Sequence, residues 1–252
     1  MRELEAASWW NSAMRDIAGY LIGTVGLPDA GVLLDVGCGS GQTMRWFRER
    51  WRGWRTIGLD VAMDGLRAAR HVDENVVDAS ALDVPLPDGA VDAVITLDVL
   101  QHLPLDGGDL RALREIRRVL RPGGRLIIRT NAQTWPRAAD DPVYDFHKYT
   151  APELRRKLET TGFRVHRLGC LNALLGLAEI PRDLRARRTG GDGYHGLLAT
   201  VPKRNLAWHA KRTWLRAEGV LVANGLSLPL GRSILAVATA APALDAPPAG
   251  RG

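Results

Sequence analysis

The chain has 252 residues and 46% apolar composition, which is enough for one enlarged α/β domain with a substantial core. Its formal charge is +6, but only four of its 34 basic residues are lysine and no basic block or zinc pattern appears, so solvated helix faces explain the charge better than nucleic-acid binding. We expect a cytoplasmic protein without disulfides, metal or a transmembrane segment. The chain has only two cysteines, no apolar run of about 20 residues and no signal-peptide pattern.

The N-terminal stretch, residues 3–25, carries apolar side chains at near-helical spacing. It predicts a helical cap within residues 1–30 that packs on the following sheet. Trp10, preceded by Trp9, offers a ring face that attracts cations, whereas ordinary apolar packing explains either tryptophan equally simply.

A glycine-rich loop follows the first predicted strand, residues 32–36. Gly37, Gly39 and Gly41 alternate there, and a helix is predicted to begin at Gln42. Glycine accepts positive φ and lets a ligand lie against the backbone, beside the free N–H groups of the helix N-terminus. The pattern predicts a nucleotide-type ligand. A dinucleotide fingerprint would require a third glycine at position 42, so that interpretation is the weaker one.

Two further predicted strands end in carboxylates. The strand over residues 56–60 ends at Asp60, 23 positions beyond Gly37, and an acid near this spacing can accept hydrogen bonds from both hydroxyls of a ribose. The strand over residues 75–79 brings Asp78 and Ala79 to the same edge. Val61 follows Asp60 at this edge.

The fourth predicted strand, residues 91–97, delivers Asp98 and His102 to the carboxyl edge of the sheet, where open α/β sheets bind ligands. We expect Asp109 to cap the next helix and residues 121–124 to end it, before a fifth strand over 126–129. A long loop over residues 131–150 contains His147, and long loops at this edge commonly carry function.

The C-terminal part begins with a capping box at Thr150 and Glu153, followed by a helix and a sixth strand over residues 163–170. Residues 171–230 depart from a minimal α/β pattern and predict a helical insertion, with helices near 171–188 and 205–222, that acts as a lid or substrate wall. Residues 233–240 fit a seventh strand. The Ala/Pro/Gly-rich residues 241–252 predict a disordered tail.

Several of these strings resemble motifs of class I S-adenosylmethionine (SAM)-dependent methyltransferases. The string from Asp35 to Gly41 is similar to their D-x-G-x-G-x-G, and Asp98-Val-Leu-Gln-His102 to their D-V-L-E-H, with glutamine in place of the acid. The resemblance implies a Rossmann-like α/β fold over residues 31–240. Such a fold has a seven-stranded, mostly parallel sheet with an antiparallel last strand and helices on both faces, here with the N-terminal cap and the helical insertion added.

The resemblance also implies a SAM site, with S-adenosylhomocysteine as product. In it Asp60 accepts from the ribose hydroxyls, Asp78 accepts from the adenine amino group and the Ala79 N–H meets a ring nitrogen. The full set of expected cofactor-binding residues is Asp35, Gly37, Cys38, Gly39, Gly41, Asp60, Val61, Asp78, Ala79, Asp98 and Trp10.

The expected activity is in-line transfer of the SAM methyl group to a small or medium-sized metabolite, on oxygen, nitrogen or carbon, as in secondary metabolism. For a hydroxyl acceptor, histidine suits proton removal near neutral pH, and His147 and His102 are the candidates. The alternative for either histidine is a purely structural role, in which its ring only forms hydrogen bonds within the fold. An RNA or protein acceptor, and a SAM-binding protein without catalysis, are the alternative functions.

Overall fold

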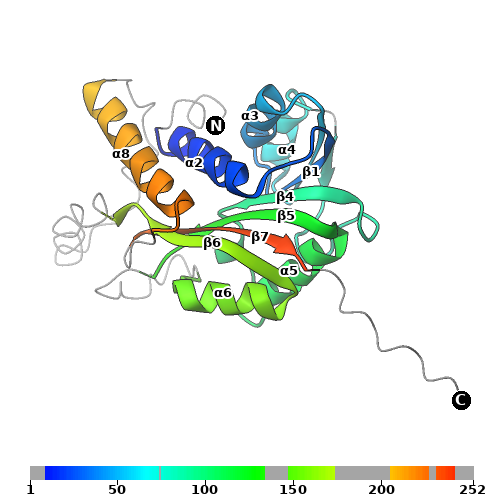
Figure 1. The fold of residues 1–252 in the computed structure, drawn as a ribbon. Coiled ribbons are helices and arrows are strands. Elements are labelled where there is room, and N and C mark those ends of the chain that lie inside the picture. The colour runs from blue at the N-terminus through cyan, green and yellow to red at the C-terminus, as the bar shows by residue number, and fades with distance from the viewer. Residues whose placement is uncertain (1–8, 74, 134–146, 174–204, 227–230, 242–252) are drawn as a thin grey trace, which may run out of the picture.

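The structure is a computed structural model that describes residues 9–73, 75–133, 147–173, 205–226 and 231–241. Its centre is a seven-stranded sheet of order β3-β2-β1-β4-β5-β7-β6 (Figure 1). The strands are β1 (Gly31–Val36), β2 (Trp54–Asp60), β3 (Val76–Asp78), β4 (Val91–Leu97), β5 (Leu120–Asn131), β6 (Phe163–Leu171) and β7 (Ser233–Ala240).

Strand directions agree with the predicted fold. The neighbouring pairs from β3 to β5 are parallel, whereas β7 runs antiparallel to both β5 and β6. The strand order reverses between β1 and β4, and at such a switch point an open α/β sheet has its ligand crevice. The glycine-rich loop, at the end of β1, lies at this point. The prediction of a Rossmann-like sheet with an antiparallel last strand is confirmed.

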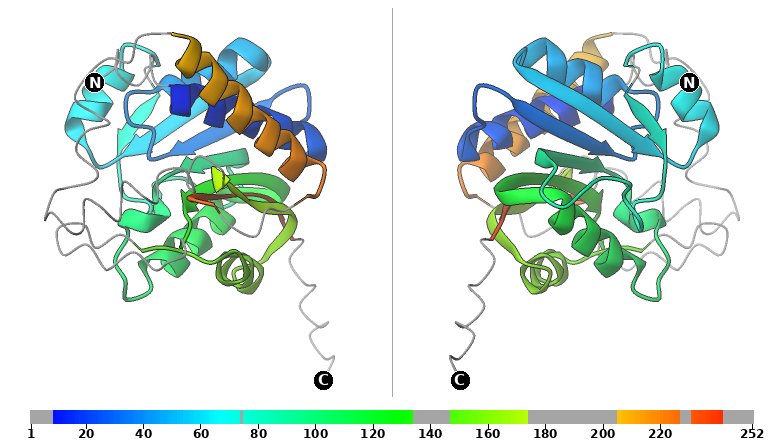
Figure 2. Two further views of the ribbon diagram at one scale, coloured as in Figure 1. Left: turned by 90° about the vertical axis from the view of Figure 1, so that its left-hand side faces the viewer. Right: turned by 90° about the vertical axis from the view of Figure 1, so that its right-hand side faces the viewer.

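Helices cover both faces of the sheet (Figures 1 and 2). One face carries α5 (Gly108–Val119) and α6 (Ala151–Thr160), and the other carries α2 (Trp9–Val25), α3 (Gln42–Arg50) and α8 (Leu206–Ala223). The shorter helices are α4 (Met63–Ala69) and the 3-10 turn η1 (Leu100–His102). Each face therefore has its own apolar core, and each of these cores includes residues of the central strands β1, β4 and β5.

The helix α2 follows the predicted periodicity: Met14, Ile17 and Leu21 are buried against the sheet. It also packs closely on α8. A Cβ atom at Gly219 of α8 would lie 2.4 Å from the Ile17 side chain, so glycine is needed there despite its cost within a helix. The N-terminal helix and the predicted 205–222 helix are thus confirmed as elements and form one layer, while the predicted helix near 171–188 and the 241–252 tail lie almost wholly outside the described residues.

One predicted cap is wrong. Gly107, with φ 98°, is the N-cap of α5, while Asp109 is buried in the first turn. Its carboxylate accepts from Lys157 Nζ at 2.6 Å and from the Tyr149 hydroxyl at 3.1 Å. Burial alone would raise the pKa of Asp109, but the Lys157 and Tyr149 hydrogen bonds hold it below its usual value. Asp109 therefore anchors α6 to α5 instead of capping α5.

Two other local expectations have clear outcomes. Thr150 and Glu153 form the predicted capping box at the start of α6. Residues 121–124, expected to end a helix, instead lie inside β5, whose pairing with β4 begins at Leu120. None of the described helices combines the length and apolar character needed to cross a membrane.

A buried carboxylate on α8 holds the chain that leaves β6. Glu218 Oε2 accepts from the Asn172 backbone N–H at 2.5 Å, and its Oε1 accepts from the Trp214 indole N–H at 2.9 Å. Asn172 has φ 63°, a left-handed conformation that ordinary side chains rarely adopt. Glu218 thus stabilises a sharp change of direction at the point where the predicted insertion begins.

We predict that Glu218→Ala lowers the free energy of unfolding by about 2–4 kcal/mol, because it leaves buried N–H donors without an acceptor. Urea denaturation monitored by circular dichroism measures this change. Glu218→Gln keeps an acceptor and is expected to lose clearly less. An alanine variant as stable as the wild type would contradict this role of Glu218.

Candidate cofactor-binding site

The loop after β1 turns tightly because all three of its alternating glycines are left-handed. Gly37, Gly39 and Gly41 have φ values of 76°, 50° and 77°. The Gly37 and Cys38 N–H groups both donate to the Leu59 carbonyl, at 2.8 and 3.0 Å. The loop is thereby fixed to the end of β2 before the chain enters α3.

The glycines leave room on one side of the loop. A Cβ at Gly37 would lie 2.2 Å from Val99 Cγ2, so this position faces the protein. Among the described residues other than its chain neighbours, no heavy atom would lie within 4 Å of a Cβ at Gly39. A ligand can therefore approach the backbone at Gly39 without displacing a side chain.

Asp60 joins this loop to the end of β2. Its Oδ2 accepts from the Gly39 N–H and its Oδ1 from the Ala62 N–H, both at 2.8 Å. Each carboxylate oxygen can accept a second hydrogen bond, which leaves capacity for two ligand hydroxyls. Asp78 is the register partner of Asp60 on β3, so both acids lie side by side at the carboxyl edge.

Asp35, near the end of β1, is almost completely buried at 2% exposure. Burial and the neighbouring charge of Asp60 raise its pKa to about 7. Its Oδ2 atom has no hydrogen-bond partner within the described part of the chain. A buried carboxyl oxygen without a donor is costly, so this atom suits a ligand that brings an N–H or ammonium group.

A cavity of about 160 Å³ lies against this loop and reaches to α2. That volume is below the range that encloses a whole cofactor, and it suits the amino-acid end of one. Asp60 and Asp78 do not line it and lie further along the same sheet edge. Its lining is Asn11, Met14, Arg15, Asp35, Gly37, Cys38, Gly39, Gln42, Thr43, Leu97, Asp98 and Arg129.

Arg129, near the end of β5, lines this cavity although no sequence motif points to it. It is only 4% exposed, and its Nε donates to Asp98 Oδ1 at 2.9 Å while its Nη2 contacts Asp98 Oδ2. Asp98 has φ 62°, and its own N–H donates to the Arg129 carbonyl. The guanidinium carbon lies 5.6 Å from the centre of the Trp10 ring. Trp10 therefore already faces a cation, one supplied by the protein.

The two candidate histidines lie together at the carboxyl edge, and neither lines the cavity. The His147 backbone N–H donates to the carbonyl of Gln101, the residue before His102. His147 Nε2 lies 3.1 Å from Glu153 Oε1, and its ring lies 4.1 Å from that of Tyr149. His102 is exposed in η1. Gln101 is buried and its side-chain oxygen accepts from Thr130 and Asn131, so it clamps η1 to β5.

Comparison with known protein families finds a match for the part of the chain that contains the glycine-rich loop and the acids at the sheet edge. A family described as a methyltransferase domain matches residues 34–128, which include the glycine-rich loop, Asp60, Asp78 and Asp98. Residues 34–128 of this chain thus match a methyltransferase domain family. The predicted family resemblance is confirmed for this part of the chain.

Curated relatives of this methyltransferase domain are partial matches. A Mycolicibacterium smegmatis protein named "Probable S-adenosylmethionine-dependent methyltransferase" is 35% identical over 59% of this chain and 58% of its own length. Trans-aconitate 2-methyltransferase from an Azoarcus species is 36% identical over 52% of this chain and 49% of its own length. A mouse tRNA (carboxymethyluridine(34)-5-O)-methyltransferase is 30% identical over 40% of this chain and 15% of its own length. The chain thus matches about half of the first relatives' length.

Solved structures show the same fold at low identity. Geranyl diphosphate C-methyltransferase from Streptomyces coelicolor, crystallised with S-adenosylhomocysteine, is 17% identical, with a TM-score of 0.57 over 88% of this chain and 74% of its own. The cyclase SpnF is 22% identical, with a TM-score of 0.58 over 92% of this chain and 82% of its own. A cyclase among these neighbours illustrates that the fold alone does not specify the reaction.

The part of the sheet edge that we expect to bind adenine differs from expectation in one contact. The Ala79 N–H donates to the Asp60 carbonyl at 3.2 Å, so it would have to exchange this bond to reach a ring nitrogen. Val61 is 67% exposed at the same edge, and Asp78 is also exposed. Both side chains are accessible to a ligand, and their roles stay predictions.

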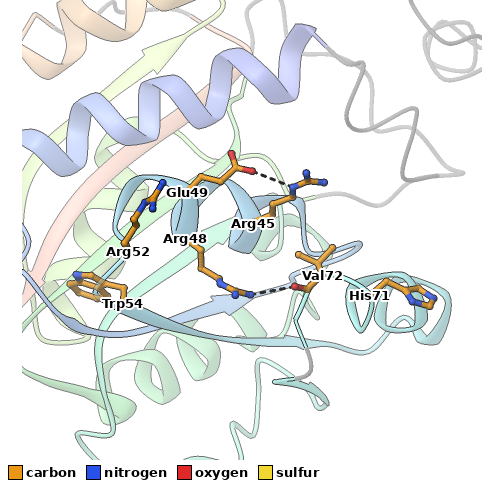
Figure 3. Close-up of a pocket in the computed structure, with 7 residues that line it drawn as sticks. All are labelled: Arg45, Arg48, Glu49, Arg52, Trp54, His71 and Val72. Carbon is orange, nitrogen blue, oxygen red and sulfur yellow. Dashed lines mark hydrogen bonds and ion pairs between the residues drawn. The ribbon is translucent and has the colours of Figure 1, made fainter.

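A second, wider groove of about 720 Å³ lies away from the glycine-rich loop, between the C-terminal half of α3 and the end of α4 (Figure 3). Arg45, Arg48, Arg52 and His71 line it, together with Glu49, Trp54 and Val72. Arg45 is paired with Glu49, and Arg48 donates to Val72 and Asp73. The groove is basic, but much of its charge is already neutralised.

The raised pKa of Asp35 predicts a pH-dependent effect of Asp35→Asn. In the unfolded chain this carboxyl ionises near pH 4, whereas in the folded protein it stays protonated up to about pH 7, so Asp35 increasingly destabilises the fold as the pH rises between these values. The asparagine variant is therefore expected to gain about 2–3 kcal/mol relative to the wild type between pH 5 and pH 8. Urea denaturation at both pH values measures the gain. A difference between the proteins that does not change with pH would contradict a buried, largely neutral Asp35.

Proposed function

We propose that this protein binds SAM at the glycine-rich loop and transfers its methyl group to a small or medium-sized metabolite. The observation that carries the proposal is the buried carboxyl oxygen of Asp35 that has no hydrogen-bond partner among the described residues, in the same cavity as the open backbone at Gly39. An ammonium group, such as the one on the methionine part of SAM, would give that oxygen a donor and favour its ionised form.

The remaining binding residues follow the sheet edge. Asp60 has acceptor capacity for two ribose hydroxyls, and Asp78 beside it is accessible to an adenine amino group. Gly37, Cys38, Gly39 and Gly41 supply the backbone cradle. Asn11, Met14 and Arg15 of α2 close the methionine end, which assigns the N-terminal cap a direct part in the site.

When bound, SAM supplies a methyl group already activated by a positively charged sulfur. The protein's own contribution is therefore orientation of the acceptor and exclusion of water, and good orientation is worth up to about 7–11 kcal/mol of a barrier. We infer that the 171–230 insertion, of which α8 forms the described part, provides the wall that excludes water and selects the acceptor.

For a hydroxyl acceptor, His147 takes the proton as the acceptor oxygen bonds to the methyl carbon and the carbon–sulfur bond breaks. Glu153 is placed to hold the imidazole by its 3.1 Å contact, and Tyr149 supports the ring from one side. His102, next to the carbonyl that binds the His147 N–H, is the second candidate. An amine acceptor needs no such base.

RNA is the alternative acceptor, and the basic groove of α3 and α4 favours it (Figure 3). Phosphates would bind there through the arginines, although two of the three are already paired with carboxylates. That neutralisation makes the metabolite proposal the stronger one. A SAM-binding protein without catalysis is the third possibility.

We predict that His147→Ala lowers turnover at least 100-fold for a hydroxyl acceptor and leaves SAM affinity within about twofold, since general-base catalysis contributes about 10²–10⁴. Transfer of labelled methyl from SAM to a metabolite pool measures turnover. His166→Ala is the matched control, because His166 lies on β6 and contacts Thr239.

Turnover unchanged in His147→Ala would contradict the assignment of the base, and His102→Ala would then be tested in the same way. Absence of any methylated metabolite, combined with RNA binding that falls steeply with salt and weakens in Arg52→Ala, would favour an RNA acceptor instead. SAM binding without transfer to either class would indicate a non-catalytic protein.

A further inference from the structure

The outward face of α8 has an unusual composition for a surface helix. Along its 18 residues, apolar side chains recur at helical spacing on the side turned away from the sheet. Leu206 is 86% exposed, Trp214 44% and Leu221 41%, and Val220 and the following Leu226 are also exposed. Three exposed alanines, at 207, 210 and 217, fill the gaps. The stripe therefore continues from one end of the helix to the other.

The opposite side of α8 belongs to the core. Trp208, Leu215 and Val222 are buried, and Leu215 and Val222 pack in the same cluster as α2 and the sheet. The helix is thus apolar on two sides, and packing within the described structure accounts for only one of them. Figure 2 (left) shows α8 as the outermost element on its side of the molecule.

Charges beside the exposed stripe are positive. The basic residues of α8 are Lys211, Arg212 and Arg216, and its one acid, Glu218, is buried under Trp214. Arg212 and Arg216 share the single carboxylate of Asp16 on α2, which also pairs with Arg50. Three guanidinium groups on one carboxylate leave a surplus of positive charge around the helix.

Trp214 is held in a defined position while much of its ring is exposed, because its indole N–H donates to Glu218. Tyr20 of α2 is exposed in the same helical layer, and its hydroxyl accepts from Arg216 at 2.6 Å. Indole and phenol rings bordered by lysine and arginine are the composition favoured where protein meets the headgroup region of a bilayer.

We propose that the outward face of α8 lies on an anionic lipid surface. The apolar stripe enters the boundary between headgroups and acyl chains, and Lys211, Arg212 and Arg216 contact the lipid phosphates. The charges of α8 favour an anionic lipid surface as the partner. The helix exposes no acidic side chain, and its charged residues beside the apolar stripe are all cationic. The helix lies on the membrane and does not cross it.

The position of α8 gives this contact a consequence for the candidate site. Lys211 Nζ lies 5.7 Å from the Trp9 ring centre, so the N-terminal half of α8 is adjacent to the end of α2 that lines the cavity. A bilayer against α8 would therefore place the cavity near the lipid surface. The membrane contact does not depend on SAM binding or on methyl transfer, and the two proposals can fail separately.

Vesicle flotation with the full chain tests the proposal, using phosphatidylcholine vesicles with and without phosphatidylglycerol. The wild type is expected to float with the anionic vesicles and not with phosphatidylcholine alone, and 0.5 M salt is expected to reduce the bound fraction. Leu206→Glu and Leu221→Glu should each lower the bound fraction at least tenfold, because each puts a carboxylate into the apolar stripe.

Leu105→Glu is the matched control, since Leu105 is 56% exposed between η1 and α5, outside this face. It should bind vesicles like the wild type, and circular dichroism should show all three variants folded. Equal flotation with both vesicle types, no flotation, or wild-type binding by folded Leu206→Glu and Leu221→Glu would each overturn the proposal. A wild-type dimer in light scattering that these two substitutions dissociate would also overturn it, by showing that a second copy covers the face.

Discussion

The Asp60 carboxylate is the constraint on which the site depends. With one oxygen it accepts from Gly39 in the glycine-rich loop, and with the other from Ala62 at the start of α4. These bonds join the ends of β1 and β2. The Gly37 and Cys38 N–H groups of the loop also donate to the Leu59 carbonyl of β2. Since the strand order reverses beside β1, the loop is held open toward the crevice where the sheet binds ligands.

The charge distribution around this loop follows from the same constraint. Asp60 contributes to the raised pKa of Asp35, and the two acids lie near a cavity that also contains Arg129 paired with Asp98. The only buried carboxyl oxygen in this group without a partner belongs to Asp35 among the described residues. A cationic ligand group at that oxygen resolves the imbalance, which connects the electrostatics of the glycine-rich loop to the proposed cofactor.

Much of the fold could be predicted because its signals are local. The strand over 91–97 and the seventh strand over 233–240 match the structure residue for residue, and the glycine positions follow from the left-handed turns they make. Thr150 and Glu153 likewise form a cap within four residues. Hydrophobic runs and capping residues act on their immediate neighbours, so they can be recognised without tertiary structure.

The partners that sequence reasoning missed are distant in the chain. Arg129 and Asp98 are 31 positions apart, Lys157 and Asp109 are 48 apart, and Asn172 and Glu218 are 46 apart. Asp109 looked like a cap because an acid before an apolar run usually is one, but Lys157 from α6 gives it another role. The cavity composition could not be predicted either, because α2 reaches it only through packing on the sheet. Local sequence patterns therefore predict the glycine-rich loop and its acidic residues. The side chains that contact them are brought there by tertiary packing and could not be predicted.

Calorimetric titration shows whether the Gly37–Gly41 loop and Asp60 form a SAM site. SAM and S-adenosylhomocysteine are titrated into the wild type, Asp60→Ala and the matched Asp64→Ala. The exposed carboxylate of Asp64 lies in α4, four positions after Asp60 in the chain, and pairs only with Arg67 within the described structure. If Asp60 binds SAM, the wild type and Asp64→Ala bind with micromolar affinity, and a folded Asp60→Ala binds at least tenfold more weakly. Binding by Asp60→Ala equal to the wild type, or no binding of either ligand by the wild type, would contradict the proposed SAM site.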